Sequence, residues 1–205
     1  ENFPAILNVW FGGCESGDAI CDVLFGDKVP SGKLTATMPK SVGQIPLYYN
    51  HLNTGRPLKE GKWFSKFTSN YLDIDNDPLY PFGYGLSYTT FKYGKPTLSS
   101  NTMTNNETIS VSVDITNTGN YDADEIAQMY IRDLAASVSR PVKELKGFER
   151  ISIKKGETKT VTFTITPEDL KFYNQELEYK NEPGEFEVMV GPNSKDVQTL
   201  TFTLK

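Results

Sequence analysis

An apolar run near the N-terminus, Pro4–Phe11, most constrains what this chain can fold into. It is bounded by a proline and by Gly12-Gly13, which is the pattern of a strand buried on both faces of a sheet. Apolar residues at helical spacing follow, with Ser16 able to cap a helix and Gly26 able to end it. Residues 30–39 predict a second short strand. Together these patterns predict a strand–helix–strand unit.

Such a unit is incomplete by itself. A single parallel crossover of about 40 residues cannot cover both faces of a sheet. More strands are needed than residues 1–40 provide, and the apolar run begins only a few residues after Glu1. We therefore expect residues 1–40 to be the C-terminal end of an α/β sandwich domain, and we expect the chain to start inside that domain.

From residue 96 onward, apolar and polar residues alternate in short runs. One face of the run 108–117 carries Ile109, Val111, Val113 and Ile115. Similar runs, separated by turn signals, predict an antiparallel sandwich; they occupy residues 125–133, 142–153, 157–166, 184–191 and 197–204. Thr166 as cap and Pro167 at the first position predict one helical turn. Because the cysteine and tryptophan pattern of antibody domains is absent, we expect residues 96–205 to form an all-β, fibronectin type III-like sandwich.

Residues 41–95 separate these two parts and are dense in aromatic side chains. A freely flexible linker would be polar, whereas this segment has enough aromatic surface to be held against neighbouring domains. Aromatic rings also stack on sugar rings, but packing of the linker is the more common role and is favoured here. The residues concerned are Trp63, Phe64, Tyr80, Phe82, Tyr84, Tyr88, Phe91 and Tyr93.

The charge of the chain argues against a nucleic-acid partner. It carries 21 basic and 26 acidic side chains, and the excess of acid lies entirely in residues 96–205. An acidic module repels phosphate groups, so we expect no nucleic acid to bind. No run approaches the roughly 18 apolar residues of a membrane-spanning helix, and no basic segment precedes the first apolar run as in a signal peptide.

The two cysteines, Cys14 and Cys21, do not indicate a disulfide. On one helix, seven residues separate them by about 10 Å along the axis, which is too far to bridge, so we expect two packed thiols. His51 is the single histidine, and no spaced cluster of cysteine and histidine accompanies it. We therefore expect no metal site and no cofactor.

Glu15 is the most attractive candidate for catalysis. It lies in a glycine-flanked loop between the predicted strand and the predicted helix, where ligands of open α/β sheets bind. A carboxylate there could be a general acid or could compensate the helix dipole, and the second interpretation is favoured because acids are common at helix starts. The same loop, residues 12–17, lacks the lysine and the spacing of a phosphate-binding loop.

A polar cluster in the linker could hydrogen-bond sugar hydroxyls. It consists of Asn50, His51, Asn53, Thr54 and Arg56. Asparagine and threonine in loops more often satisfy their own backbone, and that interpretation is favoured. No serine or cysteine nucleophile signature accompanies the histidine, so nothing indicates a catalytic triad.

Long motifs resemble glycoside hydrolase family 3 over essentially the whole chain. Residues 10–57 resemble the end of that family's second domain, and PLYPFGYGLSYTTFKY at residues 78–93 resembles its linker. Residues 115–133, 140–165 and 184–194 resemble its C-terminal fibronectin type III-like domain. Within the family, SVGQIPLYYNHLNTGRP at residues 41–57 is most similar to bacterial periplasmic β-glucosidases.

The resemblance implies a parent enzyme of three parts. A (β/α)8 barrel would supply an aspartate nucleophile and the α/β sandwich a glutamate acid/base, for retaining, exo-acting hydrolysis of terminal β-D-glucosyl or related residues. Both carboxylates are expected upstream of this chain, so no catalytic residue is assigned here, and the substrate-binding residues are unknown. Glu15 aligns with a family glutamate that is not the acid/base.

The resemblance thus predicts a C-terminal fragment with a structural role, inactive alone. Its partners would be the missing barrel and the rest of the α/β sandwich, and the substrate of the parent would be a β-linked oligosaccharide in the periplasm or outside the cell. Two alternatives stay open, because such sandwiches host many functions. They are a non-catalytic carbohydrate-binding module and a protein-interaction module.

Overall fold

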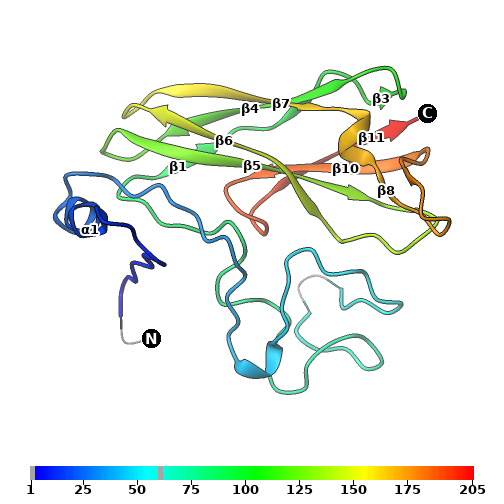
Figure 1. Ribbon diagram of the computed structural model, residues 1–205, viewed down its shortest axis with the longest axis horizontal. Coiled ribbons are helices and arrows are strands. Elements are labelled where there is room, and N and C mark those ends of the chain that lie inside the picture. Colours follow the sequence, from blue (N-terminus) through cyan, green and yellow to red (C-terminus); the bar gives the residue numbers. More distant parts are fainter. Residues whose placement is uncertain (1–2, 60–61) are drawn as a thin grey trace.

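The computed structural model describes residues 3–59 and 62–205. The C-terminal part of the chain forms a β-sandwich, and the N-terminal part runs as one α-helix, one short 3-10 helix, turns and loops along one side of it (Figure 1). The helix lies beside one end of the sandwich, and the loops drawn in cyan project from the same side. The chain therefore consists of a β-sandwich and a long segment that is attached to one side of it.

Two sheets form the sandwich. In the first, a central strand pairs with three others; they are β4 (Ile109–Asn117) with β1 (Phe91–Tyr93), β2 (Thr97–Leu98) and β7 (Thr158–Ile165). The second sheet has the order β3 (Thr102–Met103), β11 (Gln198–Leu204), β10 (Gly184–Gly191), β5 (Ala123–Asp133) and β6 (Glu144–Ile153). All pairings in these sheets are antiparallel except that of β3 with β11.

The core lies between the two sheets, where the alternating pattern places it. Ile109, Val111, Val113 and Ile115 of β4 are all almost fully buried, as the sequence predicts. From the other sheet, the rings of Phe186 and Phe202 stack with their centroids 5.5 Å apart. Burying one such side chain stabilises a protein by about 1.5–3 kcal/mol. This interior is therefore the main source of the stability of the sandwich.

The predicted helical turn is also present. It is the short helix η2 (Pro167–Leu170), which follows Thr166. The Asp169 carboxylate accepts hydrogen bonds from the backbone N–H of Thr166 at 2.8 Å and from its hydroxyl at 2.7 Å. The turn leads into a small hairpin of β8 (Phe172–Tyr173) and β9 (Tyr179–Lys180).

The strand predicted at Pro4–Phe11 is not formed, and that prediction is wrong. Residues 3–11 belong to no strand, and their apolar side chains are exposed, Ile6 to 74% and Phe11 fully. A strand persists only where its N–H and C=O groups meet a neighbouring strand. The described part of the chain provides no such neighbour for this segment.

The second predicted strand, within residues 30–39, is wrong as well. This segment lies antiparallel to the aromatic part of the linker. The Leu34 N–H donates to the Tyr84 carbonyl at 2.8 Å, and the Gly83 N–H donates to the Leu34 carbonyl at 2.7 Å. Met38 and Tyr80 form an isolated bridge further along. The segment is thus extended, but its partner is the linker and not the apolar run before the helix.

The linker also covers the outer face of β5. Gln128 and Tyr130 point away from the core, yet only 3% and 0% of their surface is exposed. The Gln128 amide donates to the carbonyl oxygens of Gly83 at 3.1 Å and Pro192 at 2.6 Å, and its oxygen accepts from the Tyr130 hydroxyl at 2.5 Å. The nitrogen and the oxygen of this buried amide therefore both have hydrogen-bond partners, as burial requires.

Aromatic contacts reinforce this attachment. The ring of Tyr49 stacks on that of Phe82 with 4.2 Å between centroids, and it meets the ring of Tyr130 edge-on at 5.9 Å. The Tyr49 hydroxyl accepts a hydrogen bond from the backbone N–H of Leu145 on β6 at 3.3 Å. Two points of the linker are therefore fixed to neighbouring strands of one sheet.

Gly83→Ala tests how closely linker and sheet approach. Gly83 has a φ of +78°, and a Cβ there would lie 2.0 Å from Oε1 of Gln128. Gly156 has a similar φ of +74° but open space around it, so it is a matched control. Positive φ alone costs an alanine about 1 kcal/mol, which we expect for Gly156→Ala. For Gly83→Ala we expect a loss of unfolding free energy of about 3 kcal/mol, measured by urea denaturation. Equal losses would contradict the close approach.

Candidate functional site

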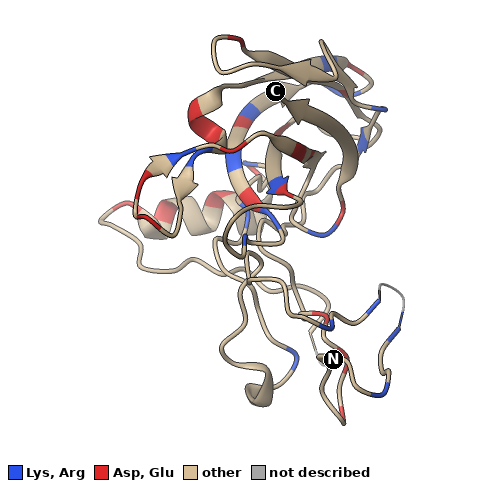
Figure 2. Cartoon of the chain, turned by 90° about the vertical axis from the view of Figure 1, so that its right-hand side faces the viewer, with Lys and Arg blue, Asp and Glu red and all other residues tan. Residues whose placement is uncertain are grey.

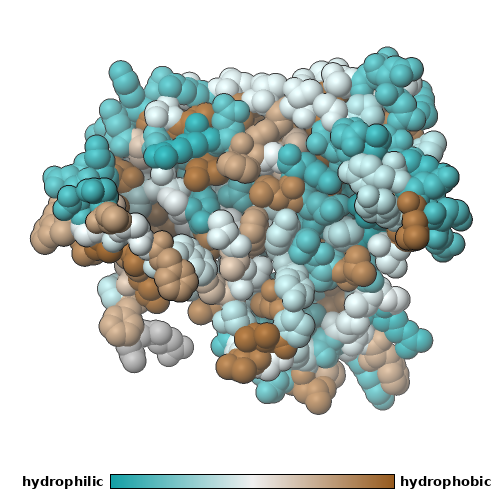
Figure 3. Space-filling view, in the orientation of Figure 1, coloured by the Kyte–Doolittle hydropathy of each residue, from teal (hydrophilic) through white to brown (hydrophobic). Residues whose placement is uncertain are grey.

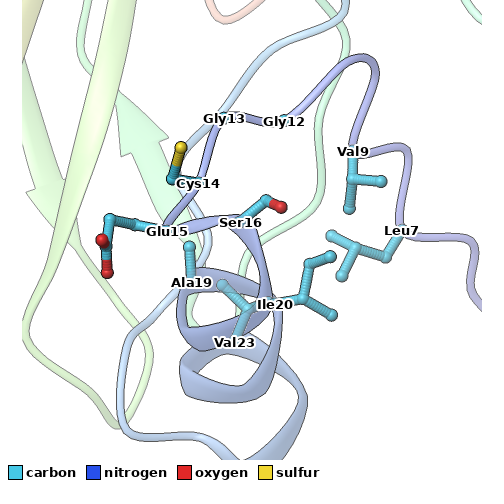
Figure 4. Close-up of a pocket in the computed structure, with 10 residues that line it drawn as sticks. All are labelled: Leu7, Val9, Gly12, Gly13, Cys14, Glu15, Ser16, Ala19, Ile20 and Val23. Atoms are coloured by element: carbon cyan, nitrogen blue, oxygen red, sulfur yellow. The ribbon is translucent and has the colours of Figure 1, made fainter.

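A hollow lies between the N-terminal segment and α1 (Ser16–Phe25). It measures about 530 Å³ and is lined mainly by apolar side chains, among them Leu7, Val9 and Ile20. Glu15 is the single carboxylate residue in this lining. Figure 4 shows that the Glu15 side chain extends away from Leu7, Val9 and Ile20. The hollow thus brings one carboxylate near an apolar surface but does not aim it into the cavity.

Glu15 occupies the N-cap of α1, one residue before the cap that the sequence predicts. The first helical residue is Ser16 and not a cap, so that prediction is off by one position. The Glu15 carbonyl accepts from the Ala19 N–H at 3.2 Å, which starts the helical hydrogen bonding. A carboxylate at this end faces the partial positive charge of the helix. At the other end, Gly26 in the left-handed conformation ends the helix as predicted.

The surface of this part of the chain is apolar. Phe3, Phe11, Leu24 and Phe25 are all exposed, and Figure 3 shows hydrophobic residues gathered over α1 and the N-terminal segment. Cys14 and Cys21 are free and exposed, so the prediction of packed thiols is wrong for this chain. Contiguous apolar surface of this kind marks a contact site for another part of a protein.

A buried ion pair joins the segment after α1 to the sandwich. The Lys33 ammonium lies 3.2 Å from both carboxylate oxygens of Glu125, which is only 3% exposed. The Tyr93 hydroxyl donates to the same carboxylate at 2.9 Å. Burial, together with the nearby negative charge of Glu125, raises the pKa of Tyr93 well above its usual range, so its hydroxyl stays a donor.

A second polar contact shapes the loops of residues 41–79. Gln44, in the short helix η1 (Val42–Gln44), is buried and donates to the carbonyls of Asp75 at 3.0 Å and Asp77 at 3.1 Å. The Lys40 ammonium binds the Asp75 carboxylate at 2.7 Å and holds its pKa below the usual value. The two ends of this loop region are therefore tied together beside the sandwich.

The polar cluster of the linker lies at the surface. Asn50, His51, Asn53, Thr54 and Arg56 are all exposed. Nδ1 of His51 is 3.0 Å from the Leu52 carbonyl oxygen, and the Thr54 hydroxyl accepts from Ser69 at 2.9 Å. The His51 carbonyl accepts from the Val142 N–H at 3.0 Å. The last contact, together with the isolated bridge of Leu52 to Pro141, attaches residues 51–52 to the connection between β5 and β6.

A second hollow, of about 440 Å³, lies where these elements meet. Residues 53–55 form one wall and residues 132–140 form the other. Asp133 is the single carboxylate residue of this lining, and Arg132 and Arg140 are its cations. No local sequence pattern predicts this hollow, because its walls come from segments far apart in the chain.

The aromatic residues of the linker divide into two groups. Tyr80 and Tyr84 stack on each other at 5.2 Å, Phe82 stacks on Tyr49, and Phe91 and Tyr93 pack against the core. Tyr88 donates to the Val23 carbonyl of α1 at 2.7 Å. Trp63 and Phe64 lie side by side and are exposed, Trp63 to 59%.

We also searched the described residues for charged patches, metal-ligand clusters and membrane-spanning helices. Figure 2 shows acidic and basic residues interspersed over the sandwich. In residues 3–59 and 62–205, no group of three or more histidine, cysteine, aspartate or glutamate side chains is arranged to hold a metal ion. Over the same residues, no helix has the length and hydrophobicity needed to cross a bilayer.

Two family descriptions match the chain. Residues 1–88 match the glycosyl hydrolase family 3 C-terminal domain, and residues 125–194 match a fibronectin type III-like domain. The predicted fold class, an α/β fragment followed by an all-β fibronectin type III-like sandwich, is thereby confirmed.

Relatives of known name span the whole chain. A periplasmic β-glucosidase from Salmonella typhimurium is 56% identical over 204 residues, covering 100% of this chain and 26% of the relative. A β-xylosidase from Formosa agariphila is 47% identical over 207 residues, covering 100% of this chain and 28% of the relative. The crystal structure of a β-glucosidase from Listeria innocua in complex with gluconolactone superposes with a TM-score of 0.90 at 45% identity, over 96% of this chain and 27% of that one. The chain therefore spans about a quarter of the length of the relatives it matches.

Lys33→Met tests the buried ion pair. It leaves the Glu125 carboxylate buried without its cation, which costs about 3 kcal/mol. Because the pair joins the segment after α1 to the sandwich, we expect the amide protons of Leu34 and Gly83 to exchange with solvent about 100-fold faster. Hydrogen exchange followed by NMR measures this rate. The exposed Lys92→Met is the control and should leave both rates unchanged; the same lack of effect for Lys33→Met would contradict the role of the pair.

Proposed function

The chain belongs to glycoside hydrolase family 3, and we propose that the protein containing it is a retaining, exo-acting β-glucosidase for which this chain is a C-terminal structural part. Its substrates are terminal β-D-glucosyl or related residues of β-linked oligosaccharides. The observation that carries this proposal is 56% identity along the whole chain to a protein named periplasmic β-glucosidase. The name of that relative also supports a periplasmic or secreted location.

The geometry of the chain supports a structural role. Retaining hydrolysis needs two carboxyl groups about 5–5.5 Å apart, one as nucleophile and one as acid/base. Each of the two hollows has one carboxylate residue in its lining, Glu15 in the first and Asp133 in the second. Neither hollow therefore provides the pair, and the catalytic carboxylates belong to the upstream barrel and to the remainder of the α/β sandwich.

The exposed apolar surface over α1 and residues 3–11 indicates where those upstream parts dock. The side chains of Ile6 and Phe11 would regain burial there, at about 25 cal/mol for each Å² removed from water. The segment that follows α1 is fixed to the sandwich by the ion pair of Lys33 with Glu125. The chain would then brace the catalytic domains against a rigid β-domain.

The isolated chain should not hydrolyse aryl β-glucosides, whereas the whole protein should. The reason is the missing carboxylate pair, whose loss removes both the nucleophile and the acid. Release of the aryl leaving group measures turnover, and NMR of the first-formed anomer should show net retention for the whole protein. Turnover by the 205-residue chain at a rate like that of the whole protein would refute the assignment, and net inversion would refute the retaining mechanism.

Glu15→Gln in the whole protein should lower kcat by less than about tenfold. The helix-dipole role of Glu15 contributes only about 0.3–1 kcal/mol of stability, whereas a general acid contributes about 10²–10⁴-fold to the rate. Asp18→Asn, in the first turn of the same helix, is a control with the same change of charge. A much larger fall in kcat for Glu15→Gln alone, with the alkaline limb of the pH–rate profile lost, would make Glu15 the acid.

A further inference from the structure

Two residues that line the second hollow each carry a buried polar atom without a hydrogen-bond partner in the described part of the protein. Among the described residues, three buried side-chain atoms have no hydrogen-bond partner: Ser87 Oγ, Asp133 Oδ2 and Arg140 Nε. Two of these three belong to residues that line this one hollow. Unpaired buried polar groups are rare in folded proteins because each costs about 1–3 kcal/mol. Their coincidence here indicates a place prepared for a ligand.

The remaining contacts of both residues hold them in place. Oδ1 of Asp133 accepts from the Ala135 N–H at 3.1 Å. The Arg140 guanidinium binds Glu144 through Nη2 at 2.8 Å and lies over the ring of Phe172 at 4.4 Å. Each residue is therefore oriented by its own partners, and the unpaired Oδ2 and Nε are left to meet something else.

The charges of the hollow select a neutral ligand. The lining offers a carboxylate acceptor on Asp133 and a guanidinium donor on Arg140, while Arg132 is paired with Glu187 at 3.4 Å. An anion would be repelled by Asp133, and a cation would be repelled by the Arg140 guanidinium. A hydroxyl group both donates and accepts, so it can satisfy a carboxylate oxygen and an Nε–H without introducing charge.

We propose that this hollow is a carbohydrate-binding site, in which neighbouring hydroxyls of one pyranose unit donate to Asp133 and accept from Arg140. Its volume of about 440 Å³ falls within the range of small-ligand sites, about 300–1,000 Å³. From the opposite wall, the exposed Asn53 offers an amide to further hydroxyls.

Access to the two unpaired atoms, which lie below the surface, requires residues 134–139 to move, and the hydrogen bonds from Ser137 to Glu182 open with that movement. That segment contains Ala135, Ala136, Ser137 and Ser139, whose small side chains are exposed or half-buried. The experiment that tests this site measures binding and not turnover, so its outcome does not depend on the hydrolase assignment.

NMR titration of the ¹⁵N-labelled chain tests the site, with D-glucose and D-xylose as the probes. We expect the amide signals of residues 53–55 and 132–140 to move together, with a Kd on the order of 1–10 mM. Asp133→Asn keeps the shape but replaces the acceptor oxygen by a donor, and it should weaken binding about tenfold or more. Asp18→Asn removes the same charge on α1, outside the lining, and should leave the Kd unchanged.

Two further variants cover the case in which Asp133→Asn does not fold. Asn53→Ala trims the opposite wall and should weaken binding a few-fold, and Ala136→Leu fills the hollow and should abolish it. The proposal is overturned if neither sugar moves these signals at up to about 100 mM, tenfold above the weakest expected Kd, because the unpaired atoms then meet water only. It is equally overturned if the shifts centre on Trp63 and Phe64, which would place the sugar on an aromatic platform instead.

Discussion

The carboxylate of Glu125 fixes where the two halves of this chain meet. It lies at 3% exposure on β5, in the second sheet, and a buried charge of this kind is tolerated only with partners. Tyr93 supplies one partner from the first sheet, and Lys33 supplies the other from the segment after α1. Both sheets and the segment after α1 are therefore bound to a single group. The path of the linker follows, because the Gln128 amide on the same strand donates a hydrogen bond to the Gly83 carbonyl.

The sequence was sufficient to predict those strands whose neighbouring strands and packing partners all lie within this chain. The alternation of Ile109, Val111, Val113 and Ile115 predicts both a strand and the face that is buried, since the opposite sheet is encoded a few dozen residues later. Pro4–Phe11 carries an equally clear apolar signal, but such a signal says only that the run prefers burial. Without a neighbouring strand it stays unpaired, and the two cysteines beside it stay exposed for the same reason.

Polar contacts between segments that are far apart in the sequence were harder to predict from the sequence. Glu125 and Gln128 carry a usable signal, since each is a polar residue inside an otherwise apolar strand. Asp133 and Arg140 carry none, because what distinguishes them is the approach of residues 53–55 from a part of the chain about 80 positions away. Charge and hydrogen-bonding capacity can be read along a sequence, whereas unpaired atoms become visible only once the partners that are present have been located.

Several main-chain carbonyl groups of the linker take part in its attachment. Those of His51, Phe82, Gly83 and Thr90 accept from Val142, Ser194, Gln128 and Thr118 respectively. A carbonyl oxygen is the same in every residue, so most side chains along these positions can change without losing the bond. The interface therefore permits the linker sequence to diverge while its path is kept. The exception is Gly83, where a side chain would collide with the very amide that holds the carbonyl.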